Sequence, residues 1–384
     1  MKILDTDIQA YINANLHVDL HSLLLKKSPF PDVPMSQIVQ QIKGKKIAQK
    51  KFSFLLKEGI IFPPHLNLEQ ASSQVTAEYK AQLLQGQSFV DLTSGFGIDA
   101  YFLSQRFSSV TLVERNHELL GIVKHNWDIL NRKANFIHNE LEDFLKENTQ
   151  TYDVVYLDPA RRGNDDRKKF LLEDLSPNIL EIQSQLHQCG QLIMVKLSPL
   201  IDVSYLLSVL QDISEVHIIA VRNEVKELLV IIRPRLKVDG ISITAINLAS
   251  GEPAFNFQYG EEQIAIAEYS SPLKYLYIPN NAILKSGAFN LIAKRFKLKK
   301  LHPNTHFYTS EMLVNEFPGR VLEVAAIDAK ELRKGERYNI ISRNHPLTPE
   351  QIKRKYKITD GGNAYLIFTQ TIDGKKIILK STGY

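Results

Sequence analysis

Two short motifs in the first half of the chain hold residue types that bind and orient a small reactive ligand. In the segment 91–97, DLTSGFG, the carboxylate of Asp91 stands just before a glycine turn. Glycines let the backbone approach a ligand closely, and the helix that follows offers unpaired N–H groups at its amino end. Glu114 follows about 20 residues later, the spacing of a side chain that binds a ribose diol. The pattern predicts a nucleoside pocket.

The second motif, DPARR at 158–162, follows an apolar run that predicts a buried strand. A carboxylate beside a rigid proline can accept hydrogen bonds from an amine and aim its lone pair, and an in-line methyl transfer mainly requires such positioning. Asp158 and Pro159 are therefore candidate catalytic residues. Guanidinium groups stack on bases or bind phosphate. We assign Arg161 to the catalytic group on this ground and Arg162 to substrate binding.

Two ligands fit the glycine turn. Gly95-x-Gly97-x-x-Ala100 matches the dinucleotide fingerprint of a nicotinamide-dependent oxidoreductase. Asp91 favours S-adenosylmethionine instead, because a carboxylate can hold the cationic amino-acid end of that cofactor and would repel a pyrophosphate. The residues expected to hold the methionine end are Asp91, Thr93, Gly95 and Gly97, and Glu114 is expected to hold the ribose.

The elements around these motifs alternate as in a doubly wound α/β domain. The predicted strands are 89–92, 109–113, 135–138, 152–157, 191–196, 216–221 and 227–232, and the predicted helices are 98–107, 117–132, 170–186 and 203–210. Ligands of open α/β sheets bind at the carboxyl ends of the strands, so both motifs converge on one edge. After the third strand, Glu140 and Glu142 are candidates to face an adenine amine, and Glu140 joins the predicted cofactor site.

The regions on either side of this sheet have different patterns. Residues 1–75 read as helical, and 68–81 predicts a helix that leads into the first strand and packs over the cofactor. Period-two alternation at 241–247 and 264–267 predicts strands. The region 272–324 predicts short strands with one helix at 287–295. The last segment predicts a strand at 337–342, a basic helix at 349–355, a turn at 360–362 and a hairpin of 365–369 with 376–379.

Charge is distributed unevenly. Residues 1–270 carry 27 lysines and arginines against 33 aspartates and glutamates, whereas residues 271–384 carry 20 against 9. A basic terminal third on an acidic body indicates a polyanionic partner. The single cysteine, Cys189, excludes a disulfide framework, and the histidine spacing predicts no metal site. The chain shows no apolar run of membrane-spanning length and no signal-peptide pattern, so we expect a cytoplasmic protein.

With these residues in view, the chain resembles the bacterial class I S-adenosylmethionine-dependent methyltransferases that end in a ferredoxin-like module and a THUMP-like domain. The matching stretches are Glu69–Ala81, Asp91–Ala100, Asp158–Arg162, Pro279-Asn280, Ile283–Phe289, Pro303–Arg320 and Ile341–Phe368. The resemblance implies a Rossmann-like α/β methyltransferase sheet and RNA as the partner of the THUMP-like domain. Expected RNA-binding residues there are Arg343, Lys353 and Arg354.

The implied organisation has five parts. They are an N-terminal helical segment at 1–75, a Rossmann-like cofactor domain at 76–238, a β connection at 239–271, a ferredoxin-like module at 272–328 and a basic THUMP-like domain at 329–384. Both C-terminal parts are small α+β modules.

Three departures bear on the function. Thr93 stands where the family's glycine motif usually begins with glycine. Ala160 and Arg161 replace the second proline and the aromatic ring of amino-methyltransferases, which puts an exocyclic amine target in doubt. The arrangement also resembles that of 5-methyluridine RNA methyltransferases, but those need a cysteine after strand five, where this chain has Ser198. The function expected is methylation of a base in structured RNA. The alternatives are the oxidoreductase and an RNA-binding protein whose methyltransferase domain is inactive.

Overall fold

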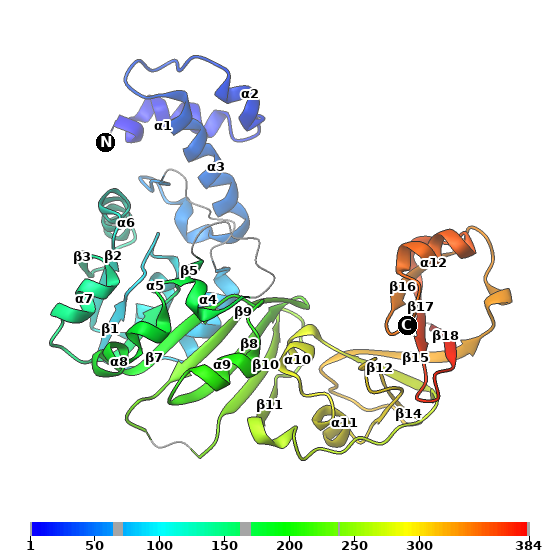
Figure 1. Cartoon of the computed structure of the whole chain (residues 1–384). Helices are drawn as coiled ribbons and strands as arrows, with labels where there is room; N and C mark the ends of the chain where they lie inside the picture. Colours follow the sequence, from blue (N-terminus) through cyan, green and yellow to red (C-terminus); the bar gives the residue numbers. More distant parts are fainter. Residues whose placement is uncertain (1, 64–71, 162–169, 237–238, 382–384) are drawn as a thin grey trace. The chain divides into compact units, whose positions relative to one another are not determined.

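The computed structural model describes residues 2–63, 72–161, 170–236 and 239–381 (Figure 1). The chain divides into two compact units. The first comprises Met1–Ile213 and Leu229–Lys237, and the second comprises Ser214–Leu228 and Val238–Tyr384. Within the described ranges, no helix is long and apolar enough to cross a membrane.

The first unit is built on a parallel sheet. Its strands lie in the order β9-β7-β4-β1-β2-β3, and β4 pairs in parallel with β1 and β7, as β2 does with β1 and β3. The strands are β1 (Ser88–Asp91), β2 (Ser109–Glu114), β3 (Asn135–His138), β4 (Tyr152–Leu157), β7 (Gly190–Leu197) and the end of β9 (Glu224–Ile232). The central strands are buried almost throughout because helices cover both faces. The predicted α/β sheet is confirmed.

Strand order brings the two motifs together. From β1 the chain adds β2 and β3 on one side, then returns to add β4 and β7 on the other. The strand order therefore reverses between β1 and β4, which is where an open α/β sheet binds its ligand. The glycine motif leaves β1 and the second motif leaves β4, so both face the same crevice.

Six helices of the first unit follow or precede these strands. They are α4 (Gln74–Gln82), α5 (Ile98–Leu103), α6 (His117–Ile129), α7 (Leu141–Glu147), α8 (Ile179–Cys189) and α9 (Val203–Val209). The predicted helix at 68–81 begins later, at Gln74, because the side chain of Ser73 caps it by accepting the Thr76 N–H at 3.3 Å. Residues 68–71 lie outside the described ranges.

The predicted helix at 170–186 is wrong in its first half. A short 3₁₀ helix (Leu172–Asp174) and strand β6 (Leu175–Ser176) come first, and β6 pairs antiparallel with β5 (Ala160–Arg161). Helix α8 begins only after Pro177, where Asn178 accepts the Leu180 N–H at 3.2 Å as the helix cap. A proline that cannot donate a backbone hydrogen bond and a capping asparagine together set this helix start.

The N-terminal segment forms a small helical body with its own apolar core. Its helices are α1 (Thr6–Ala14), α2 (Leu20–Leu24) and α3 (Met35–Lys51). The core consists of Ile3, Ile8, Ile12, Leu23, Val33, Met35, Ile38, Val39, Ile42 and Ile61. This body supports the glycine motif, because Phe62 packs on Phe96 with ring centroids 6.2 Å apart and the Asn126 side chain of α6 exchanges two hydrogen bonds with the Ile61 backbone.

The second unit opens with a hairpin and continues into a larger sheet. Strand β8 (Ile213–Val221) turns into β9, and β10 (Ser242–Leu248) runs parallel to β8 and antiparallel to β11 (Phe255–Gln258). The predicted alternation at 241–247 is confirmed. The strand predicted at 264–267 is wrong, because Ile264 and Ile266 lie in an exposed loop.

Seven strands then form one continuous sheet, in the order β13-β14-β12-β15-β18-β17-β16. The strands are β12 (Tyr275–Pro279), β13 (Lys299–Lys300), β14 (Tyr308–Ser310), β15 (Gly319–Ile327), β16 (Arg337–Ser342), β17 (Thr359–Gln370) and β18 (Lys376–Ser381). Strand β15 pairs with β12 through Gly319–Glu323 and with β18 through Val324–Ile327. One strand therefore belongs to both expected C-terminal modules.

Two local predictions in this sheet region are wrong. The helix predicted at 287–295 begins only at Leu291, as α11 (Leu291–Phe296), because Gly287 with φ of 79° ends a preceding helix, α10 (Asn281–Ser286), that was not predicted. The turn at 360–362 lies inside β17, where two glycines with positive φ allow the register with β16 to shift between Tyr338 and Asn339. Strand β16, the β17–β18 hairpin and helix α12 (Pro349–Tyr356) match their predictions.

Candidate functional site

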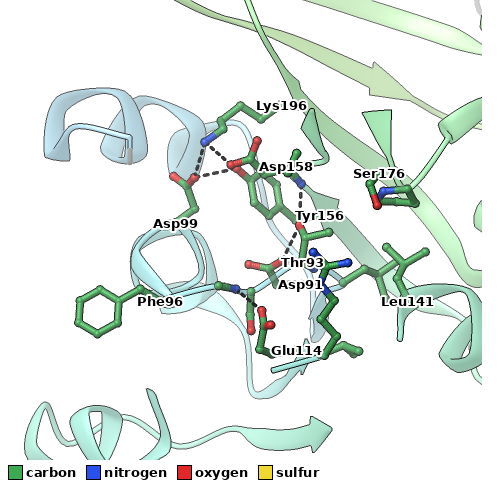
Figure 2. A pocket seen from close by; sticks show the side chains of 18 of the residues that line it. Asp91, Thr93, Phe96, Asp99, Glu114, Leu141, Tyr156, Asp158, Ser176 and Lys196 are labelled. Carbon is green, nitrogen blue, oxygen red and sulfur yellow. Dashed lines mark hydrogen bonds and ion pairs between the residues drawn. The ribbon is translucent and has the colours of Figure 1, made fainter. Parts of the chain in front are cut away.

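A cavity of about 430 Å³ lies at the carboxyl ends of β1, β2 and β4 (Figure 2). Its walls come from the glycine motif, from the turns after β2 and β3, and from the ends of β4 and β7. The residues used below that line it are Ser72, Asp91, Thr93, Gly95, Gly97, Asp99, Glu114, Glu140, Tyr156, Asp158 and Lys196. All six predicted cofactor residues line this cavity, and so does Asp158, the predicted catalytic residue at the end of β4.

Thr93 ties the two motifs to each other. Its N–H donates to Asp91 Oδ1 at 2.9 Å, and its hydroxyl oxygen accepts the backbone N–H of Asp158 at 2.7 Å. A glycine at this position, as the family motif usually has, would lack the second bond. The departure at Thr93 therefore fixes the start of the second motif against the first.

Glu114 is held in place by backbone donors. Its Oε2 accepts the Gly95 N–H at 2.9 Å, and its Oε1 accepts the Asn116 N–H at 2.8 Å. Each carboxylate oxygen keeps a second lone pair, so the side chain is pre-oriented and can still accept hydrogen bonds from a ligand. Gly95 has φ of 51°, and a Cβ built on it would meet no atom closer than 3.9 Å, so its open side faces free space.

Gly97 serves packing instead. Its φ is 73°, and a Cβ there would lie 2.9 Å from Nε1 of Trp127, the only tryptophan of the chain. The left-handed conformation and the contact with α6 both require glycine. The two glycines of the motif thus have different roles: Gly95 leaves open space beside the cavity, and Gly97 allows the turn to pack closely on α6.

Burial gives Asp91 an unusual protonation equilibrium. Its side chain is 1% exposed. Loss of solvation raises the pKa of Asp91 well above its ordinary value, the Thr93 N–H opposes this, and the negative charges of Asp99, Asp158 and Glu114 add to it. A cationic group placed beside Asp91 would relieve both the burial and the repulsion.

An ion-pair network that the sequence analysis missed adjoins this carboxylate. Asp99, in the first turn of α5, contacts Lys80 Nζ at 2.8 Å and Lys196 Nζ at 3.4 Å. Its Oδ2 also accepts hydrogen bonds from the Tyr156 hydroxyl at 2.8 Å and the Ser72 hydroxyl at 2.9 Å. Burial alone would raise the pKa of Asp99, but the two ammonium groups and these hydrogen bonds outweigh it and hold the pKa below its ordinary value.

The network ends at the second motif. Lys196, at the end of β7, also pairs with Asp158 Oδ2 (Figure 2), and its Nζ lies 3.3 Å from the Ser72 hydroxyl. These three acceptors match the three N–H groups of an ammonium. Lys196 is largely buried, whereas the Asp158 side chain is 39% exposed toward the cavity. Lys196 therefore orients the Asp158 carboxylate from its buried side, while the other side remains accessible from the cavity.

Acidic groups outnumber basic ones around the cavity. The lining carboxylates are Asp91, Asp99, Glu114, Glu140, Glu142 and Asp158, and the lining cations are Arg115 and Lys196. Lys80 and Lys196 compensate Asp99 and Asp158, so the remaining charge on the walls is negative. Such a cavity suits a ligand that carries positive charge and disfavours the pyrophosphate of a dinucleotide.

The other predicted site residues lie elsewhere. Pro159 lines a separate cavity of about 120 Å³ beside Phe170 and Leu175. The backbone of Arg161 forms part of β5, and Arg162 lies outside the described ranges. The three predicted RNA-binding residues belong to the second unit. They are Arg343, which follows β16, and Lys353 and Arg354 of α12, where Lys353 pairs with Asp360 at 2.6 Å.

Cys189 does not belong to the site edge of the sheet, because it lies at the amino end of β7. Cys189 ends α8 with 3% exposure, and burial raises the pKa of its thiol to about 11, so it is a core residue rather than a nucleophile. Ser198 follows β7, where a uridine C5 methyltransferase of the kind considered above needs cysteine. Among the described residues, no group of three or more histidine, cysteine, aspartate or glutamate side chains could hold a metal ion.

Three family models match the chain. A ferredoxin-like domain matches residues 275–318, a THUMP domain-like model matches 320–380, and the model called conserved hypothetical protein 95 matches 72–179. Together they cover the glycine motif, the second motif and the seven-stranded sheet.

Known proteins are similar to the chain at two levels. A crystal structure from Porphyromonas gingivalis W83, named as a methyltransferase, is 31% identical, with coverage of 97% of this chain and 96% of that one and a TM-score of 0.86. An uncharacterized RNA methyltransferase of Mycoplasma mobile is 29% identical over 182 residues, which is 43% of this chain. The match spans 48% of that relative, about half its length.

A substitution at Asp91 tests the electrostatics of the cavity without a ligand. Asp91→Asn keeps an acceptor for the Thr93 N–H and removes the buried charge. We expect the ligand-free variant to be more stable than the wild type at neutral pH, on the order of 1–2 kcal/mol. The measurement is thermal unfolding of both proteins across a pH series.

The stability difference between Asp91→Asn and wild type should change with pH in a definite direction. Because the pKa of Asp91 is raised on folding, its contribution to wild-type stability is lost as pH rises above the ordinary aspartate value. The advantage of the variant should therefore be larger near about pH 8 than near about pH 5. Asp153→Asn is the control with opposite sign, since N–H donors from Ser88 and Gln87 lower the pKa of Asp153. Equal unfolding temperatures for Asp91→Asn and wild type at every pH would contradict this account.

Proposed function

Because the chain belongs to the family of bacterial class I S-adenosylmethionine-dependent methyltransferases that carry C-terminal ferredoxin-like and THUMP-like domains, we propose that it methylates a base in structured RNA, either tRNA or rRNA. The enzyme class follows from the family. The observation that carries the RNA proposal is the THUMP-like match at 320–380 within the basic terminal third. The name of the Mycoplasma relative points the same way. A cytoplasmic location is part of the proposal.

The residues around the cavity of about 430 Å³ would hold the cofactor. Asp91 would take the cationic amino-acid end, since a positive group there offsets its burial. The free side of Gly95 gives that end room, and Glu114 would accept the ribose hydroxyls with its remaining lone pairs. Glu140, at the start of α7, would face the adenine. When bound, S-adenosylmethionine supplies an electrophilic methyl group.

Asp158 would orient the nucleophile of the substrate. Its carboxylate can accept a hydrogen bond from an N–H of the base and so direct the nitrogen lone pair. Two contacts hold this carboxylate still: the Thr93 hydroxyl fixes its backbone and Lys196 fixes its side chain. Lys196 acts through Asp158 and is a positioning residue. Pro159 would keep the strand exit rigid, and Arg161 and Arg162 would bind the substrate.

The direct test is transfer of labelled methyl groups from S-adenosylmethionine to total RNA from a strain that lacks this gene. Such RNA keeps the target site unmethylated. We expect label in one RNA size class, and none in RNA from the parent strain. If protein that binds S-adenosylhomocysteine gives no label with either RNA and also binds no RNA, the RNA proposal is wrong and the substrate is a protein or a small molecule.

The catalytic role of Asp158 predicts a separation of binding from chemistry. Asp158→Asn keeps the shape of the side chain but loses the anionic acceptor, so transfer should fall by about 100-fold or more. Affinity for S-adenosylhomocysteine should stay within about twofold, because the cofactor contacts lie on the β1 side. Asp143→Asn, an exposed aspartate on α7, is the control. Full activity in Asp158→Asn would remove it from the catalytic centre.

The positioning role of Lys196 predicts a different pattern of kcat and KM changes. Lys196→Met leaves Asp99 and Asp158 without the cation between them, so we expect kcat to drop by about tenfold or more, with KM for RNA little changed. Lys196→Arg should restore part of kcat, because a guanidinium can bridge two carboxylates. A change in KM alone, or no rescue by arginine, would show that Lys196 does not act by orienting Asp158.

A binding titration decides between the methyltransferase and the oxidoreductase that the glycine spacing left open. The negative cavity walls favour S-adenosylhomocysteine over NADH, and Asp91 is the main reason. The inactive RNA-binding alternative is separated by the labelling experiment, in which an inactive protein would bind cofactor and RNA yet transfer nothing.

A further inference from the structure

A basic cluster in the second unit has no role in the proposed chemistry. It consists of Lys300 of β13, His306 just before β14, and Arg343 just after β16. The charges of Lys300 and Arg343 both act on the His306 imidazole, so the three groups lie within electrostatic reach of one another. We define these three residues as the basic cluster.

Arg343 is a half-buried cation without an acid beside it. Its guanidinium lies over the ring of Phe307, 5.0 Å from the centroid, and its Nη1 is buried with no hydrogen-bond partner. In the described ranges no carboxylate forms an ion pair with it. Burial lowers the pKa of Arg343, and Tyr308 is the one titratable group that opposes this. A buried charge without a partner is costly, so the site favours an anion from outside.

His306 presents a second unsatisfied nitrogen. Its ring stacks on Phe289 with centroids 3.7 Å apart, and its Nδ1 is buried without a hydrogen-bond partner. Burial, together with the charges of Lys300 and Arg343, lowers the pKa of His306 to about 4. At neutral pH the ring is therefore uncharged, and one of its nitrogens carries a proton that can be donated to an acceptor.

Lys300 is better compensated than Arg343. Its Nζ donates to the Asn290 side chain at 3.0 Å, and the nearby Glu262 charge opposes the effect of burial on its pKa. Both oxygens of Glu262 are bonded to the backbone N–H groups of Asn290 and Leu291. The excess positive charge of the cluster is therefore on the Arg343 side, where the two unsatisfied nitrogens are.

We propose that the basic cluster binds a phosphate group, and that this group is a backbone phosphate of the RNA substrate. The RNA source rests on the proposed function. A tetrahedral phosphate offers several acceptor oxygens to the Arg343 guanidinium and the His306 ring, and arginine is well suited to such contacts. Lys300 is only 3% exposed, so its ammonium would add positive charge without a direct contact. Arg343 Nη1 and His306 Nδ1 are themselves buried, but both residues are partly exposed, so a phosphate would approach through their exposed atoms.

The position of the cluster is informative as well. Lys300 and His306 fall within the ferredoxin-like match, and Arg343 falls within the THUMP-like match. A phosphate bound there would contact both parts of the continuous sheet at once. One bound phosphate would thus position the RNA relative to both the ferredoxin-like and the THUMP-like parts.

The test compares Arg343→Met with wild type and with Arg320→Met. Arg320 is the matched control, because it also lies over an aromatic ring, Tyr365 at 4.4 Å, but is exposed and has no buried unsatisfied nitrogen. RNA affinity is measured with total RNA from the deletion strain over a range of KCl concentrations. For Arg343→Met we expect affinity to fall by about tenfold and the salt slope to decrease by about one. Arg320→Met should show a smaller loss, and neither should alter the affinity for S-adenosylhomocysteine.

A second arm uses potassium phosphate as the probe. Wild type should unfold at a higher temperature in potassium phosphate than in KCl of equal ionic strength, and Arg343→Met should lose that difference. Without phosphate the variant should be at least as stable as wild type, because it lacks an unpaired buried charge. This shows whether any loss of RNA binding comes from misfolding.

The outcomes separate the site from the proposed function. RNA binding by Arg343→Met equal to that of wild type, in affinity and salt slope, overturns the site while the function stands. If wild type binds no RNA, the proposed function fails, and the phosphate arm decides the site. Stabilisation by phosphate that depends on Arg343 then supports a site for another phosphate-bearing ligand, and its absence overturns the site.

Discussion

Alternating charge holds the candidate active site together. Lys80, Asp99, Lys196 and Asp158 follow one another as cation, anion, cation and anion, and they belong to α4, α5, β7 and the exit of β4. Two buried ammonium groups are tolerable only because each has a carboxylate partner. The pairing fixes Asp158, and within the described residues no cation pairs with the buried Asp91 carboxylate. The same interactions that make the second motif rigid therefore leave the cofactor end of the cavity ready for a positive ligand.

Local chemistry explains what the sequence predicted well. The motif residues Asp91, Gly95, Glu114 and Asp158 line one cavity because each follows a buried apolar strand, and buried strands are recognised from short apolar runs. Parallel strand order then brings their carboxyl ends together. Strands β3 and β4 have the predicted boundaries for this reason.

Long-range contacts explain what the sequence did not predict. Lys80, Asp99 and Lys196 are far apart in the chain, and nothing beside them indicates that they meet. Each alone looks like an ordinary surface charge or helix residue. Elsewhere, local patterns were overridden: Pro177 and Asn178 delay α8, and Gly287, predicted to begin a helix, instead ends α10. The apolar alternation at Ile264 and Ile266 found no neighbouring strand, and both side chains are exposed.

Strand β15 joins the ferredoxin-like and THUMP-like parts into one sheet, which limits how they can move relative to each other. Since its two halves pair with β12 and β18, the ferredoxin-like and THUMP-like parts share hydrogen bonds and a core that includes Leu276, Leu322, Ile367 and Leu379. A hinge between them would have to break a continuous sheet. The two parts therefore keep a fixed spacing. If the substrate is RNA, as proposed, this rigidity favours RNAs whose own folded features have a matching spacing, because the protein surface cannot stretch to meet them.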